Sequence, residues 1–171
     1  SAEDIIKARK RLGFDELLNI QQKLLKARMS KEIDPATRIK VNKGNIEKFK
    51  NTLPFDLTTS QERAIEEIHT DLKDPHPMKR LLQGDVGSGK TIVALISILP
   101  ILEQGLQAAI LAPTGILAQQ HFQTISNLLG DKYKIALVTK ETAKSVGSDM
   151  QLLIGTHAIL SHKERLLNKL T

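Results

Sequence analysis

The stretch RLLQGDVGSGKTIVALISILP, from Arg80 to Pro100, decides the expected fold. Within it, the segment from Gly84 to Thr91 matches the pattern G-x-x-x-x-G-K-[ST] at every fixed position. An apolar run typical of a strand precedes this segment and an apolar run typical of a helix follows it, which is the context that a phosphate-binding loop needs. The residues predicted to hold nucleotide phosphates are Gly84, Asp85, Val86, Gly87, Ser88, Gly89, Lys90 and Thr91.

Each fixed position of this loop has a physical role in binding a nucleotide. The glycines let backbone N–H groups converge on the β-phosphate without a Cβ in the way, and the helix N-terminus adds its positive dipole end. Lys90 is expected to reach the β- and γ-phosphate oxygens, and Thr91 is expected to ligate Mg²⁺. These two are the predicted catalytic residues, and ATP and Mg²⁺ are the predicted cofactors. A glycine-rich turn without a ligand is the alternative, whereas the glycine spacing is wrong for a dinucleotide-binding loop.

Strand and helix patterns alternate from Arg80 to the end of the sequence. Runs of Leu, Ile, Val and Ala without polar alternation are what strands buried on both faces require. The sequence therefore predicts an α/β fold of the P-loop NTPase type, in which helices cover a parallel sheet. The predicted strands are RLLQGDV, QAAILAPT, KIALVT and MQLLIGT, and helices are predicted from Lys90, from Gly115 and near the C-terminus.

The N-terminal third differs from the rest in charge and in pattern. Residues 1–52 contain 13 Lys and Arg against 7 Asp and Glu, whereas residues 53–171 contain 12 of each. Apolar residues recur at helical spacing between Ile5 and Leu25, and Gly13 predicts a break that gives a helical hairpin or a bent helix. We expect a basic α-helical connector over residues 1–52 and a nucleotide-binding lobe over residues 53–171. A solvated helical face and an arm that meets phosphates are both open interpretations of the basic charge.

Composition excludes several classes of site. The sequence has no cysteine and its five histidines lack paired ligand spacing, so we expect neither disulfides nor a structural metal. No apolar run is long enough to cross a bilayer and no secretory leader opens the chain, which predicts a cytoplasmic protein without membrane contact. With four Phe, one Tyr and no Trp, the chain offers no aromatic platform for bases, so nucleic-acid contact is expected through backbone phosphates.

A second signal for a nucleotide lies upstream of the loop, in LPFDLTTSQ, Leu53 to Gln61. The Gln61 amide can pair with the N6 and N7 edge of adenine, and Phe55 can lie against the ring. A Gln at the start of a helix is more often only exposed, and a Phe beside a Pro is more often in the core. Thr59 and Glu62 form a capping-box pattern, which predicts that a helix starts at this point.

Five segments of the chain carry a resemblance to a known family: RLGFDELLNIQ (Arg11–Gln21), LPFDLTTSQ, PMKRLLQGDVGSGKT, APTGILAQQH (Ala112–His121) and LLIGTHAILS (Leu153–Ser161). Together they resemble superfamily 2 DNA translocases, and most closely the RecG family of ATP-dependent DNA helicases. The related transcription-repair coupling factors usually have an aromatic residue where Ser88 stands and lack RLGFDELL. A translocase of that second kind remains an alternative.

The resemblance implies the first RecA-like motor lobe of a helicase, with Phe55 and Gln61 at adenine and the loop at the phosphates. It also implies that five residues beyond the loop face a DNA strand. They follow predicted strands, at whose carboxyl ends ligands collect in open α/β sheets, although turn chemistry or packing would also explain them. The parent protein would couple ATP hydrolysis to translocation on branched DNA, remodelling stalled forks and Holliday junctions in recombination and repair. The five residues implied at DNA are Pro113, Thr114, Gly155, Thr156 and His157.

Two departures from the family pattern affect the expected DNA contacts. Gly115 stands where the family usually has Glu, so whatever that side chain does is missing here. Thr139 matches a threonine of the family, but Lys140 and Glu141 replace the residues that usually follow it. The sequence therefore leaves open whether the turn after Thr139 contacts DNA.

Hydrolysis needs an acid that holds Mg²⁺, and no Asp-Glu pair follows the loop. The single pair, Asp15-Glu16, is interpreted as the first-turn acid of a helix. We therefore expect a lobe truncated before the Asp-Glu-x-His motif, without the second lobe or the wedge domain, that binds nucleotide weakly and does not hydrolyse it. The unfilled sheet position also predicts a non-physiological dimer through strand pairing. A non-catalytic nucleotide-binding module is the main alternative, and a small-substrate kinase is disfavoured because residues 92–162 contain no Arg.

Overall fold

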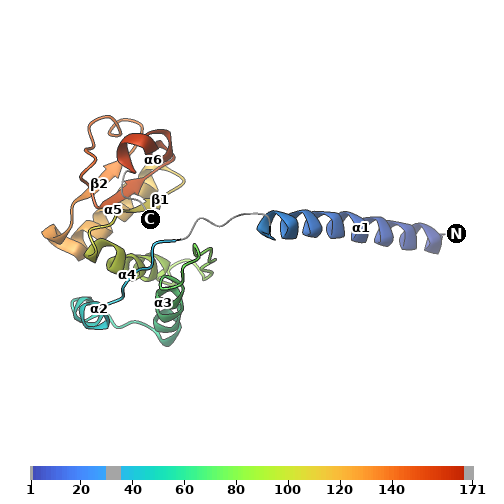
Figure 1. Cartoon of the computed structure of the whole chain (residues 1–171), viewed down its shortest axis with the longest axis horizontal. Helices are drawn as coiled ribbons and strands as arrows, with labels where there is room; N and C mark the ends of the chain where they lie inside the picture. The colour runs from blue at the N-terminus through green and yellow to red at the C-terminus, as the bar shows by residue number, and fades with distance from the viewer. Residues whose placement is uncertain (1, 30–35, 168–171) are drawn as a thin grey trace. The chain divides into compact units, whose positions relative to one another are not determined.

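The computed structural model describes residues 2–29 and 36–167, in two compact units, Ser1–Asp34 and Pro35–Thr171. The first unit contains one helix, α1 (Ala2–Met29), which runs through Gly13 without a break (Figure 1). The predicted hairpin or bend is therefore wrong. One Gly inside a helix costs only about 1 kcal/mol relative to Ala. The Arg11–Asp15 ion pair (Nε to Oδ2, 3.2 Å) also bridges the glycine at the i, i+4 spacing that supports a helix.

The second unit begins with helices and continues with alternating helices and strands. The predicted helices from Lys90 and Gly115 are confirmed, and so are three of the four predicted strands. The helices are α2 (Lys43–Lys50), α3 (Thr59–Asp71), α4 (Lys90–Glu103), α5 (Gly115–Leu129), α6 (Ala158–Ser161) and α7 (Lys163–Leu166), with a 3-10 turn η1 (Gly130–Lys132). The strands are β1 (Ala108–Leu111), β2 (Ile135–Val138) and β3 (Leu152–Gly155).

The three strands form a parallel sheet in the order β1-β3-β2. The central strand β3 is buried along its whole length, which explains its uninterrupted apolar sequence. At its carboxyl end, Gly155 is in register with Leu111 of β1 and Val138 of β2. A Cβ added at Gly155 would overlap the Val138 carbonyl oxygen, so the close approach of β2 and β3 requires glycine here.

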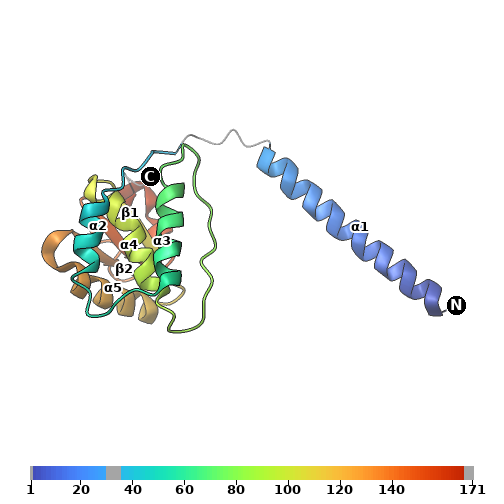
Figure 2. The ribbon, with the colours of Figure 1, turned by 90° about the horizontal axis from the view of Figure 1, so that it is seen from below.

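Helices cover both faces of the sheet. Residues of α4 and α5 pack on one face in the main core, together with Leu152 and Ile154 of β3. In that core α2 and α3 lie on either side of α4, away from the strands (Figure 2). Leu153 points to the opposite face, where it packs with Ile159 of α6 and Leu166 of α7. The sheet thus separates two apolar layers, as an α/β fold requires.

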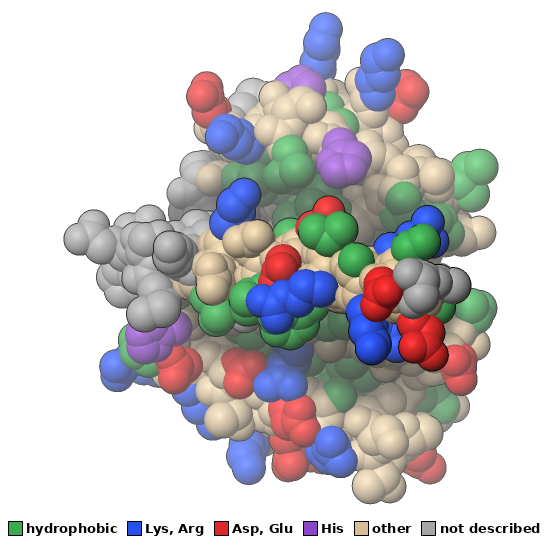
Figure 3. All heavy atoms as spheres, turned by 90° about the vertical axis from the view of Figure 1, so that its right-hand side faces the viewer, with side chains coloured by type: hydrophobic (Ala, Val, Ile, Leu, Met, Phe, Trp, Pro, Cys, Tyr) green, Lys and Arg blue, Asp and Glu red, His purple; other side chains and the backbone are tan. Residues whose placement is uncertain are grey.

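The segment at residues 36–52, predicted as part of the connector, contributes to the main core. Ile46 of α2 belongs to the main core, and Ile39 is also buried. Among the helices that the structure describes, none is both long and apolar enough to cross a bilayer. Lys and Arg side chains are interspersed with Asp and Glu on the face shown in Figure 3.

Candidate functional site

The glycine-rich loop turns sharply into α4. Gly87 and Gly89 have φ of 81° and 76°, a left-handed conformation that side chains other than glycine rarely adopt. The turn is closed by the Ser88 N–H, which donates to the Asp85 carbonyl oxygen at 3.2 Å. Gly89 is the N-cap of α4 and supplies no side-chain cap, so the first amides of this helix remain available to an anion.

Lys90 lies at the first position of α4 and folds back over the loop. Its Nζ donates to the carbonyl oxygens of Gly84 (2.8 Å) and Asp85 (2.7 Å) and approaches the Ser88 Oγ at 3.4 Å. The ammonium group therefore lies among the loop atoms that the sequence assigns to phosphate binding. With two of its three N–H groups used on carbonyl oxygens, Lys90 has one donor left for a further acceptor.

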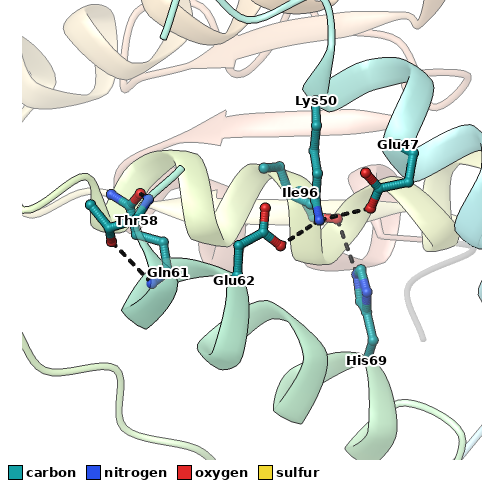
Figure 4. A network of polar contacts seen from close by, with 7 residues as sticks. All are labelled: Glu47, Lys50, Thr58, Gln61, Glu62, His69 and Ile96. Carbon is teal, nitrogen blue, oxygen red and sulfur yellow. Dashed lines mark hydrogen bonds and ion pairs between the residues drawn. The ribbon is translucent and has the colours of Figure 1, made fainter. Parts of the chain in front are cut away.

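Gln61 connects the start of α3 to the same loop. Its Oε1 accepts from the Thr58 N–H at 2.8 Å, while the Thr58 hydroxyl accepts from the Gln61 N–H, which forms a capping box (Figure 4). The predicted pair Thr59 and Glu62 is wrong by one residue, because the backbone at Thr58 is still extended. The other amide atom, Nε2, donates to the Ser88 carbonyl oxygen at 2.9 Å. Both ends of the Gln61 amide are thus engaged within the protein.

A cavity of about 430 Å³ brings the predicted adenine residues and the loop together. Phe55, half exposed, forms part of its wall, and Gln61 and Thr91 form another part. The remaining wall is apolar and comes from α4 and α5, which suits a planar ring with few polar contacts. The lining residues are Phe55, Gln61, Gly87, Gly89, Thr91, Ile92, Leu95, Thr124, Ile125 and Leu128.

The segment that enters the loop differs from the sequence prediction. RLLQGDV was expected to form a strand, but residues 77–85 have no regular structure, and Leu81 is 86% exposed. A parallel strand needs a hydrogen-bonded neighbour, and among the described residues the sheet contains only β1, β3 and β2. Arg80 of this segment is instead held by two carboxylates on α3. The apolar run alone was therefore an insufficient signal for a strand.

The residues implied at DNA lie at the carboxyl ends of the neighbouring strands β1 and β3. Pro113 and Thr114 are exposed, and the Thr114 hydroxyl caps α5 by accepting from the Leu117 N–H at 3.3 Å. His157 is exposed and Thr156 is half-buried, just before α6. Gly155 is buried, so its role in the structure is the close approach of two strands rather than an open surface.

The turn after β2 is closed by its own side chains. The Thr139 hydroxyl donates to the Glu141 carboxylate at 2.6 Å, and the Thr142 hydroxyl donates to the Leu137 carbonyl oxygen at 2.7 Å. The hydrogen bond from Thr139 lowers the pKa of Glu141 below its ordinary value. The Thr139 hydroxyl, at the position where the family resemblance suggested a DNA contact, is thus already hydrogen-bonded to the Glu141 carboxylate.

Two polar contacts beside the loop were missed by sequence reasoning. Lys50 of α2 joins Glu47 (2.9 Å) and Glu62 of α3 (2.5 Å); burial lowers the pKa of Lys50, but the hydrogen bonds to both carboxylates raise it overall. His69 of α3 is buried, with its Nε2 3.3 Å from the Ile96 carbonyl oxygen of α4 (Figure 4). The Lys50–Glu62 and His69–Ile96 contacts join residues that are 12 and 27 positions apart, so no local pattern predicts them.

A family model described as DEAD/DEAH box helicase matches residues 58–171. The chain is 41% identical over 172 residues to the ATP-dependent DNA helicase RecG of Synechocystis sp., an alignment that covers 94% of this chain and 21% of that protein. It is 41% identical over 169 residues to RecG of Aquifex aeolicus (93% and 21%) and 38% identical over 170 residues to RecG of Staphylococcus aureus (94% and 25%). The chain spans about a fifth to a quarter of the length of these relatives.

The solved structures agree with these relatives. The structure of RecG bound to a three-way DNA junction matches with a TM-score of 0.78 and 39% identity, over 92% of this chain and 23% of that chain. The UvsW helicase from bacteriophage T4 matches with a TM-score of 0.52 and 14% identity, over 82% of this chain and 53% of that chain, which shows the fold alone. The resemblance to RecG stated from the sequence is confirmed, as is the RecA-like fold class.

Proposed function

The chain belongs to the DEAD/DEAH box helicase family, and from this premise we propose that it is the nucleotide-binding part of an ATP-dependent DNA helicase that remodels branched DNA. The parent protein would act on stalled forks and Holliday junctions. Residues 1–52 would serve as a connector, and residues 53–171 as most of the first RecA-like lobe. The similarity to a RecG protein whose solved structure contains a three-way DNA junction supports the choice of substrate.

The observation that carries the proposal is the glycine loop with its uncapped helix. Backbone amides from Gly84 to Gly89 would hold the phosphates, Lys90 would hold the terminal phosphate oxygens, and Thr91 would ligate Mg²⁺. The fit is supported by the two left-handed glycines and by the absence of a side-chain cap on α4. Bound Mg²⁺ would neutralise the charge that develops on the phosphates.

The adenine ring is proposed to enter the 430 Å³ cavity beside Phe55. Gln61 uses one lone pair of Oε1 on the Thr58 N–H and one N–H of Nε2 on the Ser88 carbonyl oxygen. A second lone pair and a second N–H would therefore be left for the adenine edge, so Gln61 would read the base while it stays bound to the loop. Phe55 would lie against the ring, because half of its surface is exposed.

The DNA strand is proposed to run across the carboxyl ends of β1 and β3. The exposed groups there are Pro113, Thr114 and His157, with Thr156 half-buried beside them. Gly155 would contribute by letting the strands approach, with its backbone near the DNA rather than a side chain. Hydroxyl groups and helix-start amides are common partners of DNA phosphates.

We propose that the chain as given binds ATP weakly and does not turn it over, because no Asp-Glu pair follows the loop. The test is a titration of the full chain with ATP and Mg²⁺, alongside Lys90→Ala and with phosphate release measured on forked DNA. We expect saturable binding that Lys90→Ala abolishes, without phosphate release. Turnover that depends on Lys90 and rises with forked DNA would contradict the proposed inactivity, and equal binding by both proteins would contradict the site.

Two alternatives are separated by different observations. A transcription-repair coupling factor-like translocase is disfavoured by Ser88, which stands where an aromatic residue is usual in that family. A non-catalytic nucleotide-binding module would bind ADP and ATP but show no affinity for forked DNA. The edge of β1 that does not face β3 has no strand partner among the described residues, so pairing between two copies is also proposed, measurable as a dimer in solution.

A further inference from the structure

The entry to the phosphate loop is fixed to α3 by an ionic clamp that we define as Arg80 with Glu67 and Asp71. The Arg80 guanidinium donates to Asp71 Oδ2 from Nε (2.9 Å) and contacts the same oxygen from Nη2 (2.7 Å). Its Nη1 donates to Glu67 Oε2 at 2.7 Å. Glu67 and Asp71 are four residues apart on α3, so their carboxylates lie on one side of the helix and converge on one fork.

The two acids are placed where a helix alone would not favour them. Asp71 is the last residue of α3 and Glu67 lies one turn earlier, near the negative end of the helix dipole. Asp71 therefore depends on Arg80 for a favourable partner, whereas Glu67 is also paired with Arg63 inside α3. The charged forms stabilise one another: Asp71 raises the pKa of Arg80, and Arg63 and Arg80 together lower the pKa of Glu67. A planar guanidinium with several aligned donors fixes geometry in a way that a single ammonium does not.

The clamp is important because no secondary structure holds the segment that contains Arg80. Residues 77–85 form neither helix nor strand, and Leu82 packs against the main core while Leu81 points away. Arg80 precedes Gly84 by four residues. On the other side of the loop, Gln61 of the same helix donates to the Ser88 carbonyl oxygen. One rigid helix thus contacts the chain both before the loop and within it.

We propose that Arg80 is a positioning residue for phosphate binding, which acts by fixing the loop entry to α3 through Glu67 and Asp71. The inference rests on the proposed nucleotide function and adds a residue outside the G-x-x-x-x-G-K-[ST] pattern. Arg80 touches no nucleotide in this scheme. It sets the position from which the Gly84 backbone starts its turn.

The test compares Arg80→Ala and Arg80→Lys with a matched control, Arg63→Ala. Arg63 also pairs with Glu67 (Nε to Oε1, 3.0 Å) but belongs to α3 itself, so its removal leaves the loop entry attached. ATP affinity of the full chain is measured by titration, and hydrogen exchange over residues 78–86 is measured without nucleotide. Arg80→Ala is expected to raise the dissociation constant about 5-fold or more and to speed exchange in that segment. Arg80→Lys is expected to recover only part of the affinity, and Arg63→Ala to match the wild type.

A second variant separates positioning from stability. Glu67→Gln with Asp71→Asn removes both carboxylates; it loses exposed ion pairs, Arg63–Glu67 among them, and relieves an unfavourable charge at the end of α3, so the melting temperature is expected to change little while ATP affinity falls. Adding Arg80→Ala to this pair is expected to cause no further loss, because all three residues act as one unit. Wild-type affinity in Arg80→Ala, or additive losses, would overturn the proposal. A wild-type chain that binds no ATP would overturn the proposed function, and this proposal with it.

Discussion

Replacing His69 tests whether its imidazole completes the hydrogen bonding of α4. Pro100 lies inside α4 and has no N–H, so it cannot donate to the carbonyl of Ile96, four residues earlier. His69 Nε2 lies 3.3 Å from that oxygen and must be the donor, because a carbonyl only accepts. The side chain of His69 is only 7% exposed, and Ile96 is fully buried. Removing the imidazole therefore leaves a buried acceptor without a partner.

The magnitude follows from that orphaned carbonyl. His69→Leu keeps a side chain of similar size and is expected to lower the free energy of unfolding by about 1–3 kcal/mol, the usual cost of a buried unsatisfied group. Pro100→Ala restores an N–H that can donate to the Ile96 oxygen within the helix. The effect of Pro100→Ala alone on the free energy of unfolding is the difference of two contributions. Removing a helical proline stabilises the fold by up to about 3 kcal/mol, and the cavity left by the buried ring destabilises it. In that background His69→Leu should cost less than about 1 kcal/mol.

Urea unfolding of the four proteins of this cycle, followed by circular dichroism at pH 8, gives the coupling free energy directly. His76→Leu is the matched control, because His76 is exposed and its Nδ1 lies 2.6 Å from Asp74 Oδ1 on the surface. It should change stability by less than about 0.5 kcal/mol. An equal cost of His69→Leu with and without Pro100 would refute the reasoning, since the imidazole would then stabilise the fold by packing alone.

Three further predictions concern pH, strand packing and the helix cap. Burial holds the pKa of His69 below its ordinary 6.5, so the unfolded chain binds a proton at a pH at which the folded chain does not. The contribution of His69 to the free energy of unfolding should be complete above about pH 6.5 and should fall as the pH is lowered. His69→Leu should flatten this slope in pH-dependent melting curves. Gly155→Ala should destabilise by about 1–3 kcal/mol in urea unfolding, because its Cβ meets the Val138 carbonyl; an unchanged midpoint would contradict the close approach. Thr58→Ala should cost about 1 kcal/mol and Thr58→Ser much less, whereas Gln61→Glu should keep the capping box while losing the donor to the loop, measurable as faster proteolysis there at unchanged stability.

Part of this fold could be predicted because the information is local. The strands β1, β2 and β3 are short apolar runs followed by turn residues, and helices begin after the extended N-cap Thr114 and after the left-handed Gly89. The same apolar signal failed at RLLQGDV. An apolar run shows that a segment can be buried in a sheet, but strand formation also needs neighbours, and the described strands offer that segment none.

The candidate site could be predicted only as far as its residues share a motif. The loop was evident from its spacing, and Gln61 was found through its expected pairing with adenine. Its bond to Ser88, 27 residues away, depends on how α3 lies on the loop. The same is true of Arg80, whose partners are 9 and 13 residues earlier. Pro100 does predict an orphaned carbonyl at Ile96, but nothing in the sequence identifies His69 as its donor.

The self-contacts of Lys90 have a consequence for binding kinetics. In the proposed site, the ammonium uses two of its three N–H groups on the Gly84 and Asp85 carbonyls, so a phosphate that takes more than one hydrogen bond from Lys90 must first displace a loop carbonyl. The measured dissociation constant then exceeds the intrinsic one by the inverse of the released fraction. At high nucleotide concentration, the observed association rate should level off at the rate with which Lys90 leaves its own loop.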